Sequence, residues 1–385
     1  MADRPRSVVD CSSVNTPTTA PQPVAPDYSG ANVRGIVPAL LAPGGSAVPP
    51  WFPAEVAAAR QVVVLVLDGL GWEQLAARPD VAPTLSALRG RSLTTVAPST
   101  TATALTSIAT GLTPGEHGLM GYRMDVGGEV LNVLRWNTAA GDARRSIEPA
   151  RTQPFRPFLG ESVPVVSRAE LEGTAFTEAH LRGTRPHGWR VLSSIPVVVG
   201  QLVNAGEPFV YAYYDGIDKI AHERGFGDYY DAELAAADAM VAALIDRLPT
   251  GAALVVTADH GQVDVGERIL TPHAEVERHV RYQSGEGRFR WLHARPGAAT
   301  DLLEAARTHH SDTAWVRSRT EVLDAGWFGP LVSPPVAARL GDVALIARAD
   351  VSFYEPADSG PYPLVCRHGS LTSAEMLVPL LTTVT

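Results

Sequence analysis

The sequence lacks a continuous apolar segment long enough to cross a membrane. Of its 385 residues, 45% are hydrophobic, but they fall into short runs such as Val62–Leu67. A membrane helix needs about 20 consecutive apolar residues. The first residues, MADRPRSVVDCSS, lead into proline, threonine and serine without the apolar core of a signal peptide. We therefore expect a cytoplasmic protein with no membrane partner.

Cysteine and lysine are both scarce. The two cysteines, Cys11 and Cys366, are far apart and form no CxxC pair, so the sequence has no disulfide framework. The chain has one lysine, Lys219, and a net charge of -9. A protein that follows a nucleic-acid backbone normally carries a basic stripe, so we expect no stable nucleic-acid partner. A small anionic substrate is compatible with this charge, because bound divalent cations would supply positive charge locally.

Short apolar runs alternate with helical patterns along the chain. Runs that are apolar throughout are typical of parallel strands buried on both faces. The alternation predicts an α/β fold with a mostly parallel central sheet flanked by helices on both faces. The predicted strands are Val62–Leu67, Pro208–Tyr214, Ala252–Thr257 and Asp342–Ala347, and the clearest helices are Thr100–Thr110 and Asp231–Leu248.

The predicted organisation is one large α/β domain over residues 51–385, preceded by a Pro/Ala/Gly-rich arm over residues 1–50. Two turn-rich stretches, at about 123–194 and 270–340, interrupt the alternation of strands and helices. The first contains RMDVGGEVLNVLRW, a hairpin pattern. Ligands of open α/β sheets bind beyond the carboxyl ends of the strands. We therefore expect both stretches to be inserts that roof the site.

Acidic residues and histidines gather at or after the ends of the apolar runs. Taken singly, each has an ordinary explanation, such as a turn, a solvated ion pair or a loop. Their joint occurrence at the edge where parallel strands end indicates a functional site. The residues concerned are Asp68, Asp215, Asp218, His222, Asp259, His260 and His368.

Five motifs, in order, resemble the alkaline phosphatase superfamily, and more narrowly its nucleotide pyrophosphatase/phosphodiesterase branch. They span residues 62–380 and read VLDGLG, PSTTATALTSIATGLTPGEHG, DKIAH, TADHG and RHGSLTSAEMLVPL. Any one motif is unspecific, but the ordered set is specific. The resemblance implies an alkaline phosphatase-like fold and a metal-dependent hydrolase. Its substrate would be small and phosphorylated, such as a nucleotide, with a phosphodiester or pyrophosphate bond to be cleaved.

The resemblance also implies two divalent metal ions. One ion would be held by Asp218, His222 and His368, and the other by Asp68, Asp259 and His260 with the Thr101 oxygen. Histidine nitrogens and carboxylate oxygens together suit Zn²⁺, and Mn²⁺ accepts the same ligands.

Thr101 is the implied nucleophile, because Pro98-Ser99-Thr100-Thr101 fits the family's Pro-x-x-Thr pattern. A threonine hydroxyl attacks at neutral pH only if its alkoxide is stabilised, and two metal ions can clamp the attacking and leaving oxygens. Thr101 also begins a predicted helix, whose N-terminal amides would help to hold phosphoryl oxygens. The alternative is that these hydroxyls cap the helix.

The chain departs from the family at Gly121-Tyr122, where related enzymes have an asparagine that contacts a phosphoryl oxygen. Tyr122 or Asn132 would supply the missing donor, or both are packing or turn residues. Arg135 and Arg156, in the predicted roof, either meet the extra charge of a monoester or form exposed ion pairs. The alternative functions are a phosphomonoesterase or phosphonate hydrolase of the same superfamily, and an inactive binding or scaffold protein on this fold.

Overall fold

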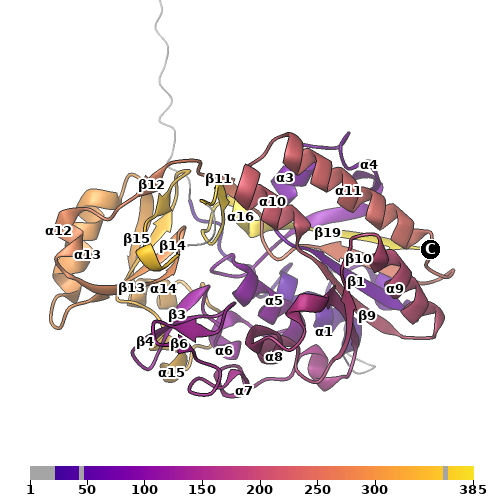
Figure 1. Ribbon diagram of the computed structural model, residues 1–385, viewed down its shortest axis with the longest axis horizontal. Helices are drawn as coiled ribbons and strands as arrows, with labels where there is room; N and C mark the ends of the chain where they lie inside the picture. The colour runs from indigo at the N-terminus through magenta and orange to yellow at the C-terminus, as the bar shows by residue number, and fades with distance from the viewer. Residues whose placement is uncertain (1–21, 43–46, 359–362) are drawn as a thin grey trace, which may run out of the picture.

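The structure is a computed structural model that describes residues 22–42, 47–358 and 363–385. A seven-stranded sheet forms the centre of its larger lobe, and a smaller lobe with a second sheet lies beside it (Figure 1). The strand order in the large sheet is β2-β19-β10-β1-β9-β7-β8. Its strands are β1 (Val62–Leu67), β2 (Arg89–Thr94), β7 (Pro164–Arg168), β8 (Arg185–Trp189), β9 (Phe209–Tyr214), β10 (Ala253–Thr257) and β19 (Leu377–Val384).

The large sheet is mostly parallel. Strand β1 runs parallel to β9 on one side and to β10 on the other, and β7 runs parallel to β8 and β9. Strand β19 is antiparallel to both of its neighbours, β10 and β2. All six residues of β1 are buried, which explains why its sequence is apolar without alternation.

Helices cover both faces of the large sheet. In Figure 1, helices α3, α4, α10 and α11 lie above it and α1, α5 and α8 lie below it. Their bounds are α1 (Ile36–Leu41), α3 (Trp72–Ala76), α4 (Pro83–Ala87), α5 (Thr101–Thr110), α8 (Ala175–Leu181), α10 (Gly216–Arg224) and α11 (Asp228–Ile245). The predicted α/β class, with helices on both faces of a mostly parallel sheet, is confirmed.

One of the strands predicted for the central sheet lies in the small lobe instead. The run Asp342–Ala347 forms β16 (Val343–Ala347), which lies in the small lobe and is antiparallel to both of its neighbours. Its residues point alternately into two separate apolar clusters: Ala344 and Ile346 into one, and the remaining three into the other. An antiparallel strand covered on both faces has the same apolar pattern as a parallel one, so the sequence did not distinguish them.

The small lobe holds a four-stranded sheet in the order β13-β14-β16-β15, and helix α13 (Ala299–His310) packs against it. Its other strands are β13 (Val280–Glu286), β14 (Phe289–Ala294) and β15 (Ala314–Ser318). Arg288, in the turn between β13 and β14, makes two hydrogen bonds to Glu375 of the large lobe, at 2.7 and 2.8 Å, with both side chains fully buried. This ion pair joins the two lobes.

The segment predicted as the first insert, 123–194, divides into two parts. Its start forms the predicted hairpin, β3 (Arg123–Val126) and β4 (Glu129–Asn132), extended by the short strands β5 (Asn137–Thr138) and β6 (Gly141–Asp142). Its end supplies β7 and β8 to the large sheet. That these segments act as roof inserts stays a prediction.

The described part of the N-terminal arm packs on the large lobe and reaches the small one, where Tyr28 OH donates to the Trp327 carbonyl at 2.8 Å. Val33, Ile36 and Val37 are fully buried in the large lobe, and the backbone N–H of Val24 donates to the carbonyl of Leu371 at 2.8 Å. Within the described residues, no helix has both the length and the apolar character that crossing a membrane requires.

Candidate metal centre

The ends of three neighbouring strands place acidic residues side by side. Strands β9, β1 and β10 pair in register, with Val66 opposite Tyr213 and Thr257. Because the strands are parallel, the residues that follow them meet at one edge. Asp68 follows β1, Asp215 follows β9, and Asp259-His260 come one residue after β10.

Helix α10 begins directly after β9 and brings two more residues to this edge. Asp218 and His222 lie one turn apart, with His222 Nε2 3.3 Å from Asp218 Oδ1. This contact matches the DxxxH spacing of the sequence.

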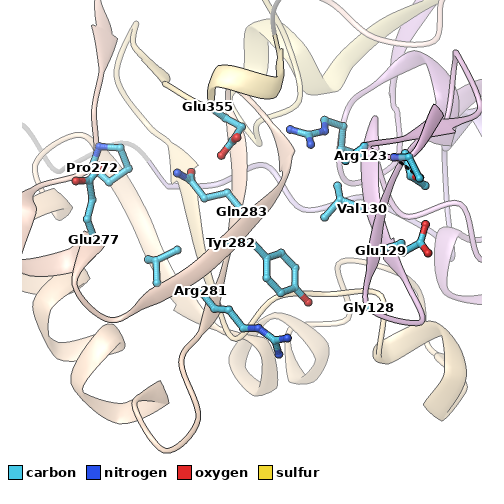
Figure 2. Close-up of a pocket in the computed structure, with 14 residues that line it drawn as sticks. Arg123, Gly128, Glu129, Val130, Pro272, Glu277, Arg281, Tyr282, Gln283 and Glu355 are labelled. Atoms are coloured by element: carbon cyan, nitrogen blue, oxygen red, sulfur yellow. Dashed lines mark hydrogen bonds between the residues drawn. The ribbon is translucent and has the colours of Figure 1, made fainter.

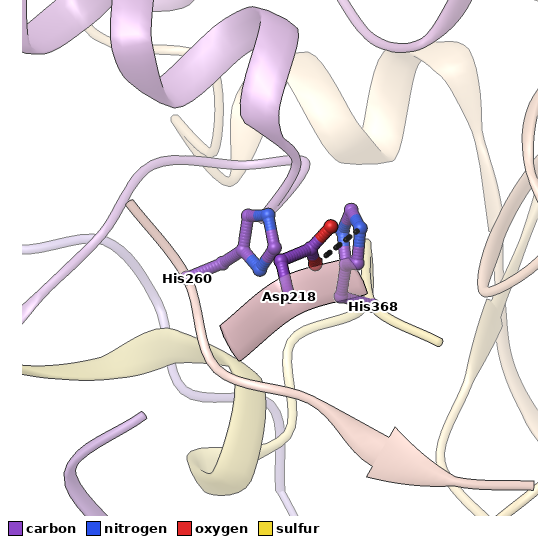
Figure 3. A group of neighbouring side chains, drawn as sticks. All are labelled: Asp218, His260 and His368. Carbon is purple, nitrogen blue, oxygen red and sulfur yellow. Dashed lines mark ion pairs between the residues drawn. The ribbon is translucent and has the colours of Figure 1, made fainter. Parts of the chain in front are cut away.

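His368 comes from the far end of the chain. Strand β18 (Cys366–Arg367) pairs with β11 (Val263–Asp264), which follows His260 closely. His368 Nε2 therefore lies 4.0 Å from Asp218 Oδ1, and its ring stacks on that of His260 with 3.6 Å between centroids. Figure 3 shows both imidazoles beside the Asp218 carboxylate.

The three histidines share one arrangement. In each, Nδ1 contacts a backbone carbonyl: His222 that of Cys366 at 2.6 Å, His260 that of Gly261 at 3.1 Å, and His368 that of Ser99 at 2.9 Å. A carbonyl only accepts, so Nδ1 carries the hydrogen and Nε2 keeps its lone pair. This orientation is typical of metal-binding histidines. Burial lowers the pKa of His260 and of His368, which favours the neutral imidazole that a metal requires.

The carboxylates fit a cation. Asp68 Oδ1 and Asp259 Oδ2 are buried without a hydrogen-bond partner, and they lie 3.5 and 3.4 Å from His260 Nε2. Burial, and after it the charge of Asp259, raises the pKa of Asp68. Burial also raises the pKa of Asp259 and of Asp218. Buried carboxylate oxygens without partners are costly, and divalent cations would neutralise them.

The other oxygens of these carboxylates are held by the protein. Tyr213 OH donates to Asp68 Oδ2, and the backbone N–H groups of Gly69 and His260 donate to Asp259 Oδ1 at 3.1 and 3.0 Å. These bonds orient the unpaired oxygens toward His260.

Two groups of side chains have ligand atoms within 4.8 Å of one another: Asp68, Asp259 and His260 in the first, and Asp218, His260 and His368 in the second. The first group is the predicted set. In the second, His260 stands where the prediction places His222, although His222 contacts Asp218 directly. All six predicted ligands thus lie in one cluster with His260 at its middle. Their roles as ligands stay predictions.

Thr101 is the first residue of α5, and its Oγ1 lies 3.1 Å from His260 Nε2. The preceding residues are tied to the His368 loop, because the Ser99 hydroxyl donates to the Ser370 carbonyl at 2.6 Å. Thr100 is the N-cap residue but makes no side-chain capping bond. The Thr100 side chain instead lies near the Glu286 carboxyl, with which it lines the larger cavity. Of the two threonines, Thr101 is the one that faces the cluster.

Two cavities meet at Thr101. The larger, of about 440 Å³, lies between the cluster and the small lobe, and its lining includes Tyr122, Arg135, Glu286, Arg367 and His368. The smaller, of about 230 Å³, lies between α5, α8 and β9, and its lining combines apolar and aromatic side chains, such as Leu105, Phe176 and Tyr211, with polar and charged ones, such as Asp215 and Lys219. The arrangement fits a substrate that has a different group on each side of its reacting bond.

The predicted donors Tyr122 and Asn132 are linked to each other. Asn132 Nδ2 donates to Tyr122 OH at 2.7 Å, and Asn132 Oδ1 accepts the backbone N–H of Arg135 at 3.0 Å. Asn132 is thus occupied in the turn and does not line the larger cavity, whereas Tyr122 does and keeps its own hydroxyl hydrogen. Arg135 also lines the larger cavity, and Arg156 lines neither.

Two further residues of the larger cavity were not found from the sequence. Glu286, at the end of β13, is 5% exposed, and its Oε1 has no hydrogen-bond partner. Burial raises the pKa of Glu286 to about 8, although the nearby Thr100 side chain acts against this. Its Oε1 lies 3.6 Å from where a Cβ on Gly121 would be, so it is close to the place where the family has its asparagine. Arg367 was not singled out because the interpretation of its motif, RHGSLTSAEMLVPL, rested on the neighbouring His368.

A third and more open groove, of about 660 Å³, runs between the β3–β4 hairpin and β13 (Figure 2). Tyr282 of β13 and Val130 of the hairpin lie on its two sides. Arg123 also lines this groove and forms an ion pair with Asp358, at 3.2 Å, which lines the larger cavity. This pair therefore lies between the groove and the larger cavity.

Comparison with known proteins gives one family. A model of type I phosphodiesterases/nucleotide pyrophosphatases matches residues 62–191 and 204–371. A search of curated protein sequences gives no match.

Among solved structures, murine ectonucleotide pyrophosphatase/phosphodiesterase 5 is similar with a TM-score of 0.62 at 14% identity, covering 83% of this chain and 87% of that one. An inactive threonine-to-alanine variant of the murine protein, in complex with AMP, gives the same values. Phosphonoacetate hydrolase from Sinorhizobium meliloti 1021, in complex with phosphonoacetate, has a TM-score of 0.60 at 18% identity, covering 84% of this chain and 90% of that one.

These likenesses support the fold, and the family match extends over most of the chain, including every residue of the cluster. The chain belongs to the type I phosphodiesterase/nucleotide pyrophosphatase family of the alkaline phosphatase superfamily, a family of hydrolases that act on phosphoesters.

Proposed function

We propose that the protein is a two-metal hydrolase that cleaves phosphodiester or pyrophosphate bonds through a phosphothreonine intermediate on Thr101. The observation that carries this proposal is the position of the Thr101 hydroxyl. It lies at the start of α5, 3.1 Å from His260 Nε2, at the point where the two cavities meet.

The six side chains of the cluster would hold two metal ions. These ions would most simply be Zn²⁺, with Mn²⁺ as the alternative. When bound, the ions would stabilise the alkoxide and the charge on the phosphoryl oxygens. The bonds from Nδ1 to backbone carbonyls keep Nε2 of His222, His260 and His368 available for this role.

Thr101 Oγ1 would then attack the phosphorus in line with the leaving oxygen. As the Thr101 hydroxyl gives up its proton, the Oγ1–P bond forms and the bond from phosphorus to the leaving oxygen breaks, and the leaving group departs after taking up a proton. A water molecule next attacks the phosphothreonine, the Oγ1–P bond breaks, and Thr101 regains its proton. Tyr122 would donate its free hydroxyl hydrogen to a phosphoryl oxygen, held in place by Asn132.

Two relatives support a threonine-based reaction on a small phosphorylated substrate. The murine relative is inactive as a threonine-to-alanine variant and is known in complex with AMP. The bacterial relative is a phosphonoacetate hydrolase. A nucleotide is therefore the first substrate class to test.

The test compares Thr101→Ala with its neighbour Thr100→Ala. Alanine is a good helix former, so both proteins should fold and keep their metals. With bis-p-nitrophenyl phosphate, Thr101→Ala should lower kcat by about 10³-fold or more, because it removes the attacking atom. Thr100→Ala, with its side chain turned to Glu286, should cost less than about 10-fold. The reverse order would assign the nucleophile to Thr100.

The same assay separates the alternative functions. The wild-type protein should hydrolyse bis-p-nitrophenyl phosphate with a higher kcat/KM than p-nitrophenyl phosphate at equal metal content. A clear preference for the monoester would make the protein a phosphomonoesterase. The absence of both activity and bound metal would favour a binding or scaffold protein.

A further inference from the structure

Arg367 presents an unpaired cationic group to the larger cavity. It ends β18 and lines the cavity together with Thr101 and His368. Its side chain is partly buried, its Nε has no hydrogen-bond partner, and no ion pair or hydrogen bond of its guanidinium occurs among the described residues. A guanidinium in a partly buried position is normally matched by an anion.

The acidic neighbours of Arg367 are committed elsewhere. Asp358, which also lines the cavity, pairs with Arg290 and Arg123. Glu375 is paired through both of its oxygens with Arg288. Neither carboxylate is therefore free to neutralise Arg367.

The remaining charged groups of the cavity lead to the same conclusion. Glu286 forms no ion pair with Arg367, and burial raises the pKa of its carboxyl, which favours the uncharged form. Lys219 is paired with Asp215 at 2.5 Å, and Asp218 is one of the predicted metal ligands. Arg135 is exposed, lines the same cavity as Arg367 and forms no ion pair among the described residues, so it is a second free cation there.

The Arg367 guanidinium lies beside the backbone of the small lobe at Gly287. A Cβ on Gly287, in the turn between β13 and β14, would lie 2.9 Å from Arg367 Nη1. The absence of a side chain at Gly287 leaves the room that the guanidinium occupies. Arg367 is thus positioned before any ligand binds, which lowers the entropic cost of recognition.

We propose that Arg367, assisted by Arg135, binds a second anionic group of the substrate, a phosphate or a carboxylate, on the larger-cavity side of the scissile phosphorus. This inference rests on the proposed function, since it takes Thr101 as the reacting residue. The planar guanidinium matches either anion through two parallel hydrogen bonds. The smaller cavity, where Lys219 is paired with Asp215, is left for an uncharged group. The preferred substrates are then pyrophosphates, or phosphate esters whose leaving group carries a carboxylate, rather than simple diesters.

The kinetic test uses Arg367→Met, which removes the charge at similar length, and Arg367→Lys, which keeps it. The substrates are ADP, which has a second phosphate, and bis-p-nitrophenyl phosphate, which has none. Arg367→Met should lower kcat/KM for ADP about 10- to 100-fold more than for the diester. Arg367→Lys should recover part of the loss. Arg60→Met, at an exposed arginine without a described partner, is the control and should match the wild type.

Binding measurements keep the test independent of turnover. Calorimetry on the metal-loaded Thr101→Ala protein, with and without Arg367→Met, would use inorganic pyrophosphate, phosphonoacetate and orthophosphate. Arg367→Met should weaken the binding of pyrophosphate and of phosphonoacetate at least 10-fold more than the binding of orthophosphate. If pyrophosphate loses more affinity, the preferred group is a phosphate. If phosphonoacetate loses more affinity, the preferred group is a carboxylate.

The outcomes separate the two proposals. If the wild type hydrolyses neither substrate but Arg367→Met selectively weakens pyrophosphate or phosphonoacetate binding, the proposed function fails and the anion site stands. Equal losses on ADP and the diester, or equal losses for all three ligands, would overturn the anion site. A fall in metal content of Arg367→Met, measured alongside, would also overturn it, because the residue would then act through His368.

Discussion

Replacing Glu286 by glutamine should make the metal-free protein more stable at alkaline pH. Glu286 is 5% exposed, and burial raises its pKa from 4.5 to about 8. Between these two values the folded state holds a proton that the unfolded state has released. Stability therefore falls as pH rises through this window. Glutamine has almost the same shape and has no proton to lose.

The structure sets the size of the effect. One pH unit corresponds to about 1.4 kcal/mol, so the rise from 4.5 to about 8 amounts to about 5 kcal/mol when the group is fully ionised. Between pH 5.5 and pH 8 the wild type should lose about 3 kcal/mol that Glu286→Gln keeps.

Urea unfolding of chelator-treated protein, at several pH values from 5.5 to 8.5, measures this difference. The gap between Glu286→Gln and the wild type should widen steadily toward pH 8. Glu73→Gln, at an exposed glutamate, should follow the wild-type curve at every pH. Parallel curves for wild type and Glu286→Gln would mean that Glu286 ionises alike in both states, and the reasoning from its burial would be wrong.

Three further predictions follow from contacts of single side chains. The purified protein should contain about two transition-metal ions per chain, and His368→Ala should lower this number in elemental analysis; unchanged metal content and activity would refute its role as a ligand. Tyr213→Phe, which removes the donor to Asp68 Oδ2, should weaken metal binding about 10- to 100-fold in a chelator competition while leaving the fold intact. Arg288→Met leaves Glu375 buried without its partner and should destabilise the protein by about 3–5 kcal/mol in thermal unfolding; a loss below about 1 kcal/mol would show that water reaches the pair.

The sequence predicted the part of the site that depends on local order. Each acidic residue at a strand end follows a run of apolar residues, and parallel strands in register bring such ends together whatever lies between them. Asp218 and His222 are joined by helical spacing alone. These features can be predicted from the spacing of residues within a helix or strand and from the direction in which the strands run.

What the sequence did not show depends on contacts between distant segments. Arg367 has no ion-pair partner because Asp358 pairs with Arg123 of β3 and Arg290 of β14. A local sequence pattern cannot predict which of several distant arginines pairs with one aspartate. Glu286 lies in a strand of the small lobe without any motif, and its place beside Gly121 arises from the packing of the two lobes. The run Asp342–Ala347 was assigned to the wrong sheet because two apolar clusters, rather than two helical layers, cover it.

The order of strands in the large sheet has a consequence for how the chain folds. Val62 of β1 pairs with Phe209 of β9 and with Ala253 of β10, partners that leave the ribosome well over a hundred residues later. Until then the edges of Val62–Leu67 have no native neighbour, and an unpaired apolar strand is prone to self-association. Contacts of such long sequence separation also slow folding. Refolding from denaturant should therefore be slow, and its yield should fall steeply as the protein concentration rises.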